Sequence, residues 1–239
     1  MVEIFAKNIS RPLSAGEKKK IAAILSDEQL KKAARFKRRK DAEVSLWSSF
    51  FSRQILSRFV GVEPEELVFS ANKYGRPGLA FPKVKNLDFN IAHSGDWLVM
   101  AVGDSQVGID IEKIRPLETD IAKGFFTARE FDYINKDPCQ QNARFFEIWT
   151  LKESFVKAIG KGLIYPLKNI EFSVVGSQKI SAKIKGGQQW HFKGYGLDPS
   201  YKLAACSQKN NFPKSVKILN NNTRFRQLIL SPENDRKTE

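Results

Sequence analysis

The sequence contains few of the residues that build disulfide frameworks or thiolate and imidazole metal sites. It has two cysteines, Cys139 and Cys206, and two histidines, and the cysteines do not stand in a metal-binding or disulfide spacing. No stretch approaches the ~18 apolar residues of a membrane span, and the N-terminus lacks the basic and apolar segments of a signal peptide. We therefore expect a soluble, cytoplasmic protein without a membrane-bound or exported form.

Glycine-rich phosphate loops are absent, and acidic residues are in the minority. Neither a P-loop nor a dinucleotide-binding glycine pattern occurs. The 40 Lys and Arg outnumber the 26 Asp and Glu and give a net charge of +14. Such an excess indicates an acidic partner, which could be nucleic acid, an anionic membrane, a polyphosphate cofactor or an acidic protein. Hydrophobic residues make up 41% of the 239 residues, enough for one large domain or two of ordinary size.

A clear period-two pattern covers residues 107–112, which read Val-Gly-Ile-Asp-Ile-Glu. It predicts a strand whose odd positions enter the core, while Asp110 and Glu112 emerge on the other face about 7 Å apart. Two carboxylates so close repel each other unless a positive charge lies between them. For this segment alone, a strand with a solvated acidic edge is the simpler interpretation.

A second segment, 148–159, has apolar residues at helical spacing and ends at glycines. Trp149, Glu153 and Lys157 follow one another at four-residue steps, so they share one helix face. Alone, Glu153 and Lys157 would be an ordinary surface ion pair. With Asp110 and Glu112, the chain offers three acids and a lysine, a set suited to a hard divalent ion and a phosphate.

Four motifs in order resemble those of the 4'-phosphopantetheinyl transferases. They are Tyr74-Gly-Arg-Pro77, Phe89-Asn-Ile-Ala-His-Ser-Gly95, Gly108-Ile-Asp-Ile-Glu112 and the run Trp-x-x-Lys-Glu-Ser-Phe-x-Lys-x-x-Gly-Lys-Gly that starts at Trp149. The resemblance extends from about Arg11 to Phe212 and is to the long, single-chain Sfp type. It implies transfer of the 4'-phosphopantetheine arm of coenzyme A to a serine of an apo acyl or peptidyl carrier protein, with release of adenosine 3',5'-bisphosphate.

The resemblance also implies roles for individual residues. Asp110, Glu112 and Glu153 are expected to hold Mg²⁺ against the pyrophosphate, and Glu153 could also take the serine proton. Lys157 and His93 are expected to neutralise charge on the leaving phosphate. The coenzyme contacts that follow from the matched motifs are Arg39, Lys40, Arg76, His93, Ser94, Asp110 and Lys157.

Within this set, Lys40 and Arg39 match the site of the 3'-phosphate, and Arg76 matches a position near the adenine. Ser94 is expected beside a phosphate together with His93. The chain departs from many relatives at Ala92, where they have a serine.

Two other functions remain possible from the residues alone. A Mg²⁺-dependent nuclease would also use acids, a lysine and a basic surface, but its lysine usually follows the acid by two residues on a strand. A non-catalytic basic module would leave the grouping of Asp110, Glu112 and Glu153 unexplained. No aromatic ladder interleaves the cations of 35–40, and no nucleic-acid-binding motif occurs, so we expect no nucleic-acid partner.

The expected fold is α+β with two similar α/β halves, and the family resemblance implies that these halves form an intramolecular pseudo-dimer. Trp47 and Trp149, Phe69 and Phe172, and Phe89 and Phe192 recur at one spacing of about 102 residues. We expect an N-terminal half at 1–104 with the coenzyme nucleotide contacts, a C-terminal half at 105–212 with the metal site and carrier docking, and a polar tail at 213–239. An internal pseudo-dimer makes a monomer the expected state.

Local patterns predict the elements. Capping boxes place helix starts near 15, 27 and 128, and a further helix is expected from Lys40 to Arg58. Strands are expected from Leu67 and at 87–92, 97–103, 106–112, 170–175, 180–185, 189–195 and 201–206. The segment from Ile121 to Phe126 is either an apolar dock for the carrier or ordinary core.

Overall fold

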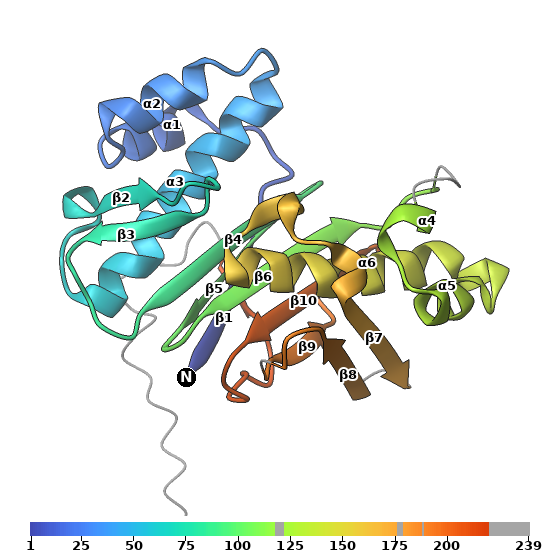
Figure 1. Ribbon diagram of the computed structural model, residues 1–239. Helices are drawn as coiled ribbons and strands as arrows, with labels where there is room; N and C mark the ends of the chain where they lie inside the picture. The colour runs from blue at the N-terminus through green and yellow to red at the C-terminus, as the bar shows by residue number, and fades with distance from the viewer. Residues whose placement is uncertain (118–121, 176–178, 188, 220–239) are drawn as a thin grey trace, which may run out of the picture.

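The computed structural model describes residues 1–117, 122–175, 179–187 and 189–219 (Figure 1). The same order of elements occurs twice along the chain, as a strand, three helices, a hairpin and two more strands. The first series consists of β1 (Val2–Asn8), α1 (Ala15–Ala22), α2 (Asp27–Ala34), α3 (Arg39–Val60), β2 (Val68–Ala71), β3 (Pro77–Phe81), β4 (Asp88–Ser94) and β5 (Trp97–Gly103).

The second series consists of β6 (Val107–Lys113), α4 (Ala122–Phe125), α5 (Ala128–Asn135), α6 (Gln141–Ile159), β7 (Ile170–Val175), β8 (Lys179–Ile184), β9 (His191–Tyr195) and β10 (Tyr201–Ser207). A short strand, β11 (Lys217–Ile218), follows. Short 3₁₀ turns occur at Pro64–Glu66, Pro138–Gln140, Gly162–Ile164 and Leu167–Asn169. The α+β class and the two similar halves are as the sequence predicts.

Each half contains a sheet with the same strand arrangement. The first sheet has the order β11-β1-β5-β4 and the second β6-β10-β9. Both central pairs are antiparallel, with Ile4 opposite Ala101 in one half and Ile109 opposite Ala205 in the other. β6 therefore corresponds to β1, and β10 corresponds to β5.

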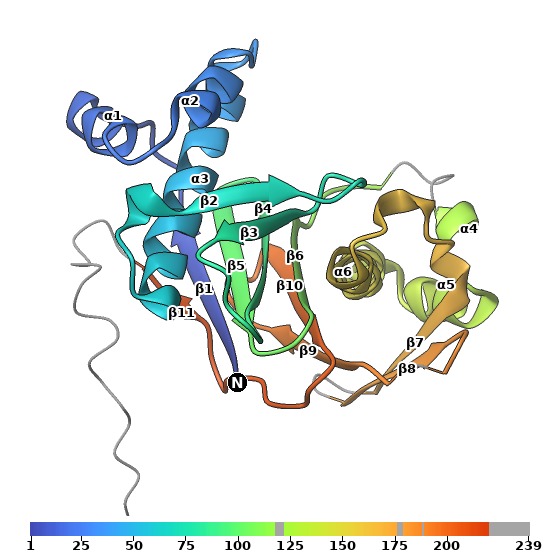
Figure 2. The ribbon, with the colours of Figure 1, turned by 60° about the vertical axis from the view of Figure 1, so that its left-hand side comes forward.

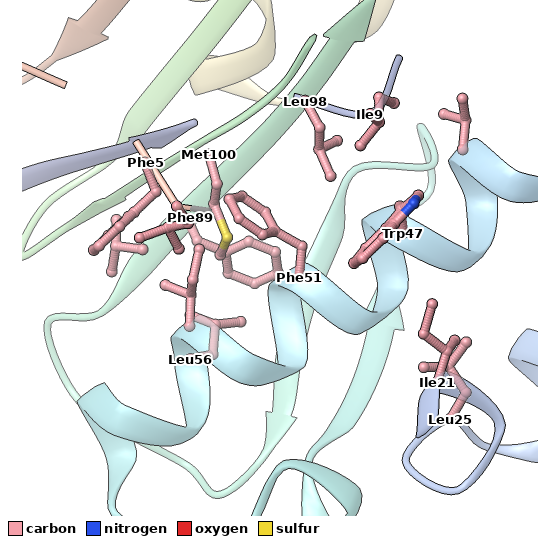
Figure 3. Packing of buried hydrophobic residues seen from close by; sticks show 14 of the residues in the cluster. Phe5, Ile9, Ile21, Leu25, Trp47, Phe51, Leu56, Phe89, Leu98 and Met100 are labelled. Atoms are coloured by element: carbon pink, nitrogen blue, oxygen red, sulfur yellow. The ribbon is translucent and has the colours of Figure 1, made fainter. Parts of the chain in front are cut away.

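The core has three parts, which follow from the two faces of each sheet. One cluster, which includes Phe51, Phe89 and Met100, fills the space between the first sheet and α1–α3 (Figure 3). A second lies among α5, α6 and the second sheet, and a third is shared by β1, β5, β6 and β10. Figure 2 shows the two sheets between α3 and α6. The third cluster thus joins the halves through apolar burial.

A buried cation supports the long helix of the first half. Arg53 of α3 donates to the carbonyl oxygens of Pro64 at 2.7 Å and Leu67 at 2.8 Å, and to Gln29 Oε1 at 2.8 Å. Gln29 belongs to the capping box that begins α2. The arginine therefore connects two helices to the turn that leads into β2.

A lysine makes the corresponding contacts in the second half. Lys152 of α6 donates to the carbonyl oxygens of Leu167 at 2.8 Å and Ile170 at 2.6 Å. It also lies 2.9 Å from Glu130, and neither side chain is exposed. Glu130 belongs to the capping box that begins α5, as Gln29 does for α2. The repeat thus extends to the hydrogen bonds of buried polar groups.

Most predicted elements occur within two residues of their expected ends. All three predicted capping boxes have both of their hydrogen bonds. The helix predicted from Lys40 begins at Arg39 and ends at Val60, with Gly61 in the left-handed region at φ 73°. Strands β1, β3 and β11 were not predicted. Among the described residues, no helix is long and apolar enough to cross a membrane.

The start of the predicted polar tail belongs to the first sheet. Ile218 of β11 pairs in parallel with Ala6, and the Leu219 N–H donates to the Ala6 carbonyl at 2.8 Å. Leu219 is 2% exposed and belongs to the core cluster of the first half. The rest of the predicted tail, 220–239, lies outside the described residues.

Candidate active site

The acidic residues of β6 follow Gly108, where α6 packs closely against the strand. Gly108 makes this approach possible, because a Cβ there would collide with the Ser154 carbonyl oxygen and lie 2.7 Å from the Ala158 nitrogen. Even-numbered positions of β6 therefore face α6, while Ile109 and Ile111, both 0% exposed, enter the central core. The predicted division of the strand into two faces is confirmed, and its polar face is covered by a helix.

Asp110 is a buried carboxylate with one strong partner. It is 3% exposed, which rules out a solvated acidic edge. Lys157 Nζ donates to its Oδ1 at 2.5 Å, whereas its Oδ2 is buried and has no hydrogen-bond partner among the described residues. Burial raises the pKa of Asp110 to about 7, the Lys157 charge opposes this rise, and the neighbouring Glu112 and Glu153 carboxylates add to it. An additional positive charge nearby would therefore stabilise the ionised form of Asp110.

Glu153 reaches the same region from α6. Its Oε1 is also buried, and no group in the described ranges forms a hydrogen bond with it. Burial raises the pKa of the Glu153 carboxyl, Lys157 opposes the rise, and Glu112 adds to it. The structure therefore brings Asp110, Glu153 and Lys157 together from two elements, as the sequence predicts.

Glu112 is held from the first half of the chain. Ser94 at the end of β4 donates its hydroxyl to Glu112 Oε2 at 2.9 Å and accepts the Lys113 N–H at 3.1 Å. Ser94, expected beside a phosphate of the coenzyme, therefore also orients an acid of the site. Its contact with the coenzyme stays a prediction.

The three acids have the chemistry of a site for a hard cation, although they do not form a closed cage. Among the described residues, no three acidic, histidine or cysteine side chains are arranged as a metal-binding group. Asp110 Oδ2 and Glu153 Oε1, however, are buried carboxylate oxygens without donors. Buried oxygens of this kind need a proton or a cation, and carboxylates are the ligands that Mg²⁺ prefers. The residues present therefore fit a divalent ion.

His93 lies near the end of β4, where the charges of Glu112 and Lys157 act on its imidazole. Desolvation lowers the pKa of His93, and Lys157 lowers it further, whereas Glu112 and Asp41 act in the opposite direction. The imidazole is consequently neutral at pH 7 without a ligand. It can donate a hydrogen bond to a phosphate and gain a proton when one binds.

Arg39 and Lys40 lie in the exposed first turn of α3. Arg39 Nε donates to Glu43 at 2.9 Å, and Lys40 Nζ lies 3.5 Å from Asp96. Exposed pairs of this type contribute little to stability, so an incoming phosphate can compete for both cations. The influence of Asp41 on His93 shows that the start of α3 is near the end of β4. Their predicted contact with the 3'-phosphate is compatible with this position.

The structure surrounds Arg76 with protein groups. Its guanidinium donates to both Asp88 oxygens, at 3.0 and 2.7 Å, and to the Lys157 carbonyl at 2.8 Å. Asn72 donates to the Gly160 carbonyl at 3.0 Å. These bonds join the β2–β3 loop to the C-terminal end of α6. The contact expected near the adenine stays a prediction, and Arg76 has a structural role that the sequence did not indicate.

Sequence reasoning also missed Asp88 and Asn90. Both lie on β4 with side chains directed to β6, where they accept backbone N–H groups. The available signal was the spacing of the two polar residues within a predicted strand. Without a known partner for that face, the spacing could not be assigned a function.

Two family models together cover most of the chain. One, for the 4'-phosphopantetheinyl transferase superfamily, matches residues 106–206, and one for the N-terminal part of 4'-phosphopantetheinyl transferases matches residues 12–105. A 4'-phosphopantetheinyl transferase of Bacillus subtilis is 36% identical over 219 residues, which are 91% of this chain and 97% of the relative. The chain belongs to this family.

A second curated relative is consistent with this membership. The Bacillus subtilis (strain 168) 4'-phosphopantetheinyl transferase Sfp is 33% identical over 220 residues, with 91% of this chain and 97% of the relative covered. A solved holo-[acyl-carrier-protein] synthase of Thermotoga maritima matches with a TM-score of 0.37 and 19% identity, over 43% of this chain and 61% of that one.

In this transferase, the first half does not repeat the acids of α6. Counted from the equivalent tryptophans, Phe51 and Ile55 of α3 take the places of Glu153 and Lys157. Phe51 is 0% and Ile55 is 1% exposed, and both belong to the core of the first half. The helix of the first half therefore provides packing where α6 provides charge.

Strand β1 differs from β6 in the same way. The equivalent register places Phe5 and Lys7 at the positions of Asp110 and Glu112. Lys7 is 2% exposed, with its ammonium 4.3 Å from the centre of the Trp47 ring. A cation and a phenyl ring cannot replace two carboxylates at a metal, so only the second half carries the acidic set.

The apolar segment before α5 is divided between core and surface. Phe126 is 4% exposed and lies 5.0 Å from the Phe145 ring, whereas Phe125 is 37% exposed and lies 5.6 Å from the Trp149 ring. Phe126 is therefore core. Phe125 is exposed enough to contact the carrier protein, and that contact stays a prediction. Ile121 lies outside the described residues.

Proposed function

We propose that this chain transfers the 4'-phosphopantetheine arm of coenzyme A to the serine hydroxyl of an apo acyl or peptidyl carrier protein. The remaining product is adenosine 3',5'-bisphosphate. The family membership supports the reaction class. The observation that carries the proposal for this chain is the pair of buried, unpartnered oxygens of Asp110 and Glu153 beside Lys157.

Asp110, Glu112 and Glu153 are the residues that would hold Mg²⁺. When bound, the ion would neutralise charge on the pyrophosphate of coenzyme A. Such transfers need positioning and charge neutralisation more than covalent catalysis by the protein. The site supplies both, because Gly108 lets α6 contact β6 and Ser94 orients Glu112.

The remaining residues have separable roles. Glu153 accepts the serine proton, either directly or through a water; its raised pKa makes it a stronger base than an exposed glutamate. Lys157 and His93 neutralise charge on the leaving phosphate. Arg39 and Lys40 bind the 3'-phosphate, and Arg76 lies near the nucleotide while it supports α6.

The partners follow from the charge of the chain. A net charge of +14 suits both a polyphosphate substrate and an acidic carrier protein. The apolar cluster shared by the two sheets already provides an internal pseudo-dimer interface, which supports a monomeric enzyme. We assign the enzyme to the cytoplasm, where coenzyme A and carrier proteins meet.

A product assay tests the proposed reaction. The protein is incubated with coenzyme A, Mg²⁺ and an apo carrier protein, and adenosine 3',5'-bisphosphate is measured by chromatography. We expect its release only when the carrier is present, and none when the acceptor serine of the carrier is replaced by alanine. Cleavage of plasmid DNA in the same buffer, without that release, would instead support the nuclease alternative.

A further inference from the structure

A row of side chain to backbone hydrogen bonds joins the two halves beside the acids. Strands β4 and β6 belong to different sheets. Alternate β4 side chains accept alternate β6 N–H groups, namely Asp88 from Val107 at 2.9 Å, Asn90 from Ile109 at 3.0 Å and Ser94 from Lys113 at 3.1 Å. We refer to these three acceptors as the seam. They fix the position of β6 along β4, since no backbone ladder joins these two strands in the part of the chain that the structure describes.

The seam has one gap. The spacing that relates its three bonds places Ala92 opposite Ile111, and the alanine methyl cannot accept a hydrogen bond. Ala92 is 5% exposed and Ile111 is 0% exposed. The gap therefore falls at the peptide that links Asp110 to Ile111, between the two acidic residues of the strand.

Two seam residues are also linked to the site, Ser94 directly and Asp88 through Arg76. The Asp88 carboxylate binds Arg76, which donates to the Lys157 carbonyl at 2.8 Å, and Ser94 donates to Glu112 at 2.9 Å. Asn90 is 4% exposed and accepts the N–H of the residue before Asp110. The first half thus orients the elements that carry the acids and the lysine.

We propose that Asn90 is a positioning residue for metal and coenzyme binding, acting with Asp88 and Ser94 through the backbone of β6. This inference rests on the proposed function. The physical reason is that a carboxylate binds a metal well only when its backbone is fixed, and loss of outer partners weakens metal affinity by about 10–100-fold. Without Asn90, the Ile109 N–H would be buried without an acceptor, so β6 would shift to find one.

The test compares two substitutions on the same strand. Asn90→Leu keeps a side chain of similar size and removes the acceptor. Phe89→Leu alters a residue that is 3% exposed and packs in the core cluster of the first half, on the other face of β4. The affinity of the full chain for Mg²⁺ in the presence of coenzyme A is measured by calorimetry, and thermal unfolding is measured for each variant.

We expect Asn90→Leu to weaken Mg²⁺ affinity by about 10–100-fold, while Phe89→Leu lowers the unfolding midpoint and keeps the parent affinity. Parent affinity in Asn90→Leu, or an equal loss in Phe89→Leu, would overturn the positioning role. A parent chain that shows no binding of Mg²⁺ and coenzyme A would count against the proposed function itself.

Filling the gap gives a second test that does not depend on ligands or on the folding of Asn90→Leu. Ala92→Ser places a hydroxyl opposite the Ile111 N–H, and Ala92→Cys is the control, with a similar size and a weak acceptor. One added hydrogen bond should raise the unfolding midpoint by about 2–4 °C in a chain of this length, with no such rise in Ala92→Cys. An unchanged or lower midpoint in Ala92→Ser would contradict the seam.

Discussion

Lys157 Nζ donates to one oxygen of Asp110 at 2.5 Å, while the other oxygen of Asp110 is buried and has no hydrogen-bond partner in the part of the chain that the structure describes. The lysine therefore compensates only part of the charge that the protein buries at this site. The shortage of positive charge is largest without metal or coenzyme. It makes the stability of the free protein sensitive to pH and to divalent ions.

The raised pKa of Asp110 predicts the direction in which the stability of the protein changes with pH. Because its pKa rises from 3.8 to about 7 on folding, the folded protein binds more protons between these values, and stability falls as pH increases across that range. In EDTA, we expect Asp110→Asn to be more stable than the parent at pH 8, by at most about 4 kcal/mol, with the difference shrinking towards pH 4. Urea unfolding at several pH values measures this, and a difference that does not change with pH would show that Asp110 is not the titrating group.

Arg39 and Lys40 should act on coenzyme affinity. Replacing both with alanine should raise the KM for coenzyme A and change kcat less, because exposed cations at a distant phosphate contribute mainly to binding. With 3'-dephospho-coenzyme A, the same change should have a much smaller effect, since the phosphate partner is missing. Equal losses with the two substrates would place these cations elsewhere, for example at the carrier protein.

Removing one charge of the Lys152–Glu130 pair should destabilise the protein much more than removing both. Lys152→Met leaves Glu130 buried without a counter-ion and should lower the free energy of unfolding by about 3–5 kcal/mol. Adding Glu130→Gln should restore much of this loss, because both charges are then removed while the amide oxygen can still accept a backbone N–H in place of the Glu130 carboxylate. Lys168→Met, at an exposed position, serves as a control. A double variant no more stable than Lys152→Met would indicate that the Lys152 bonds to the two carbonyl groups dominate.

Glu153 and Lys157 should respond differently to Mg²⁺. Glu153→Gln removes charge and basicity, and kcat should fall by about 10²–10⁴-fold without recovering at high Mg²⁺ if Glu153 is the base. Lys157→Ala should lower kcat through lost charge neutralisation while Mg²⁺ affinity stays near that of the parent. A titration of kcat with Mg²⁺ measures both. Full recovery of Glu153→Gln at high Mg²⁺ would leave Glu153 as a ligand alone.

Local patterns predicted the acidic strand and its helix because their signals are contained in short segments. Alternation at 107–112 and four-residue steps from Trp149 determine which side chains share a face. The capping boxes at Ser14, Ser26 and Thr127 likewise need only neighbours three residues away. These features therefore appear in the structure close to where the sequence predicts them.

Elements that depend on distant partners were missed. Strand β1 is buried on both faces. Ile4 belongs to the cluster shared by the two sheets, and Phe5 belongs to the core cluster of the first half. The sequence of β1 therefore does not alternate between apolar and polar residues. β3 begins with Pro77 and Gly78, which strand propensity penalises. The partners of Gly108 and Arg76, and the seam at Asn90, arise only when β6, β4 and α6 meet. These contacts join residues that are far apart in the sequence, so no local pattern predicts them.

The most direct measurement of the central claim is the intact mass of an apo carrier protein after incubation with coenzyme A and the parent chain. With Mg²⁺ we expect the carrier to gain the mass of one phosphopantetheine arm, and in EDTA we expect no gain. Asp110→Ala and Glu112→Ala should each abolish the gain while unfolding at or slightly above the parent midpoint, because a repulsive carboxylate pair is relieved. Carrier modification by the parent in EDTA, or at the parent rate by either folded variant, would contradict the acidic metal site.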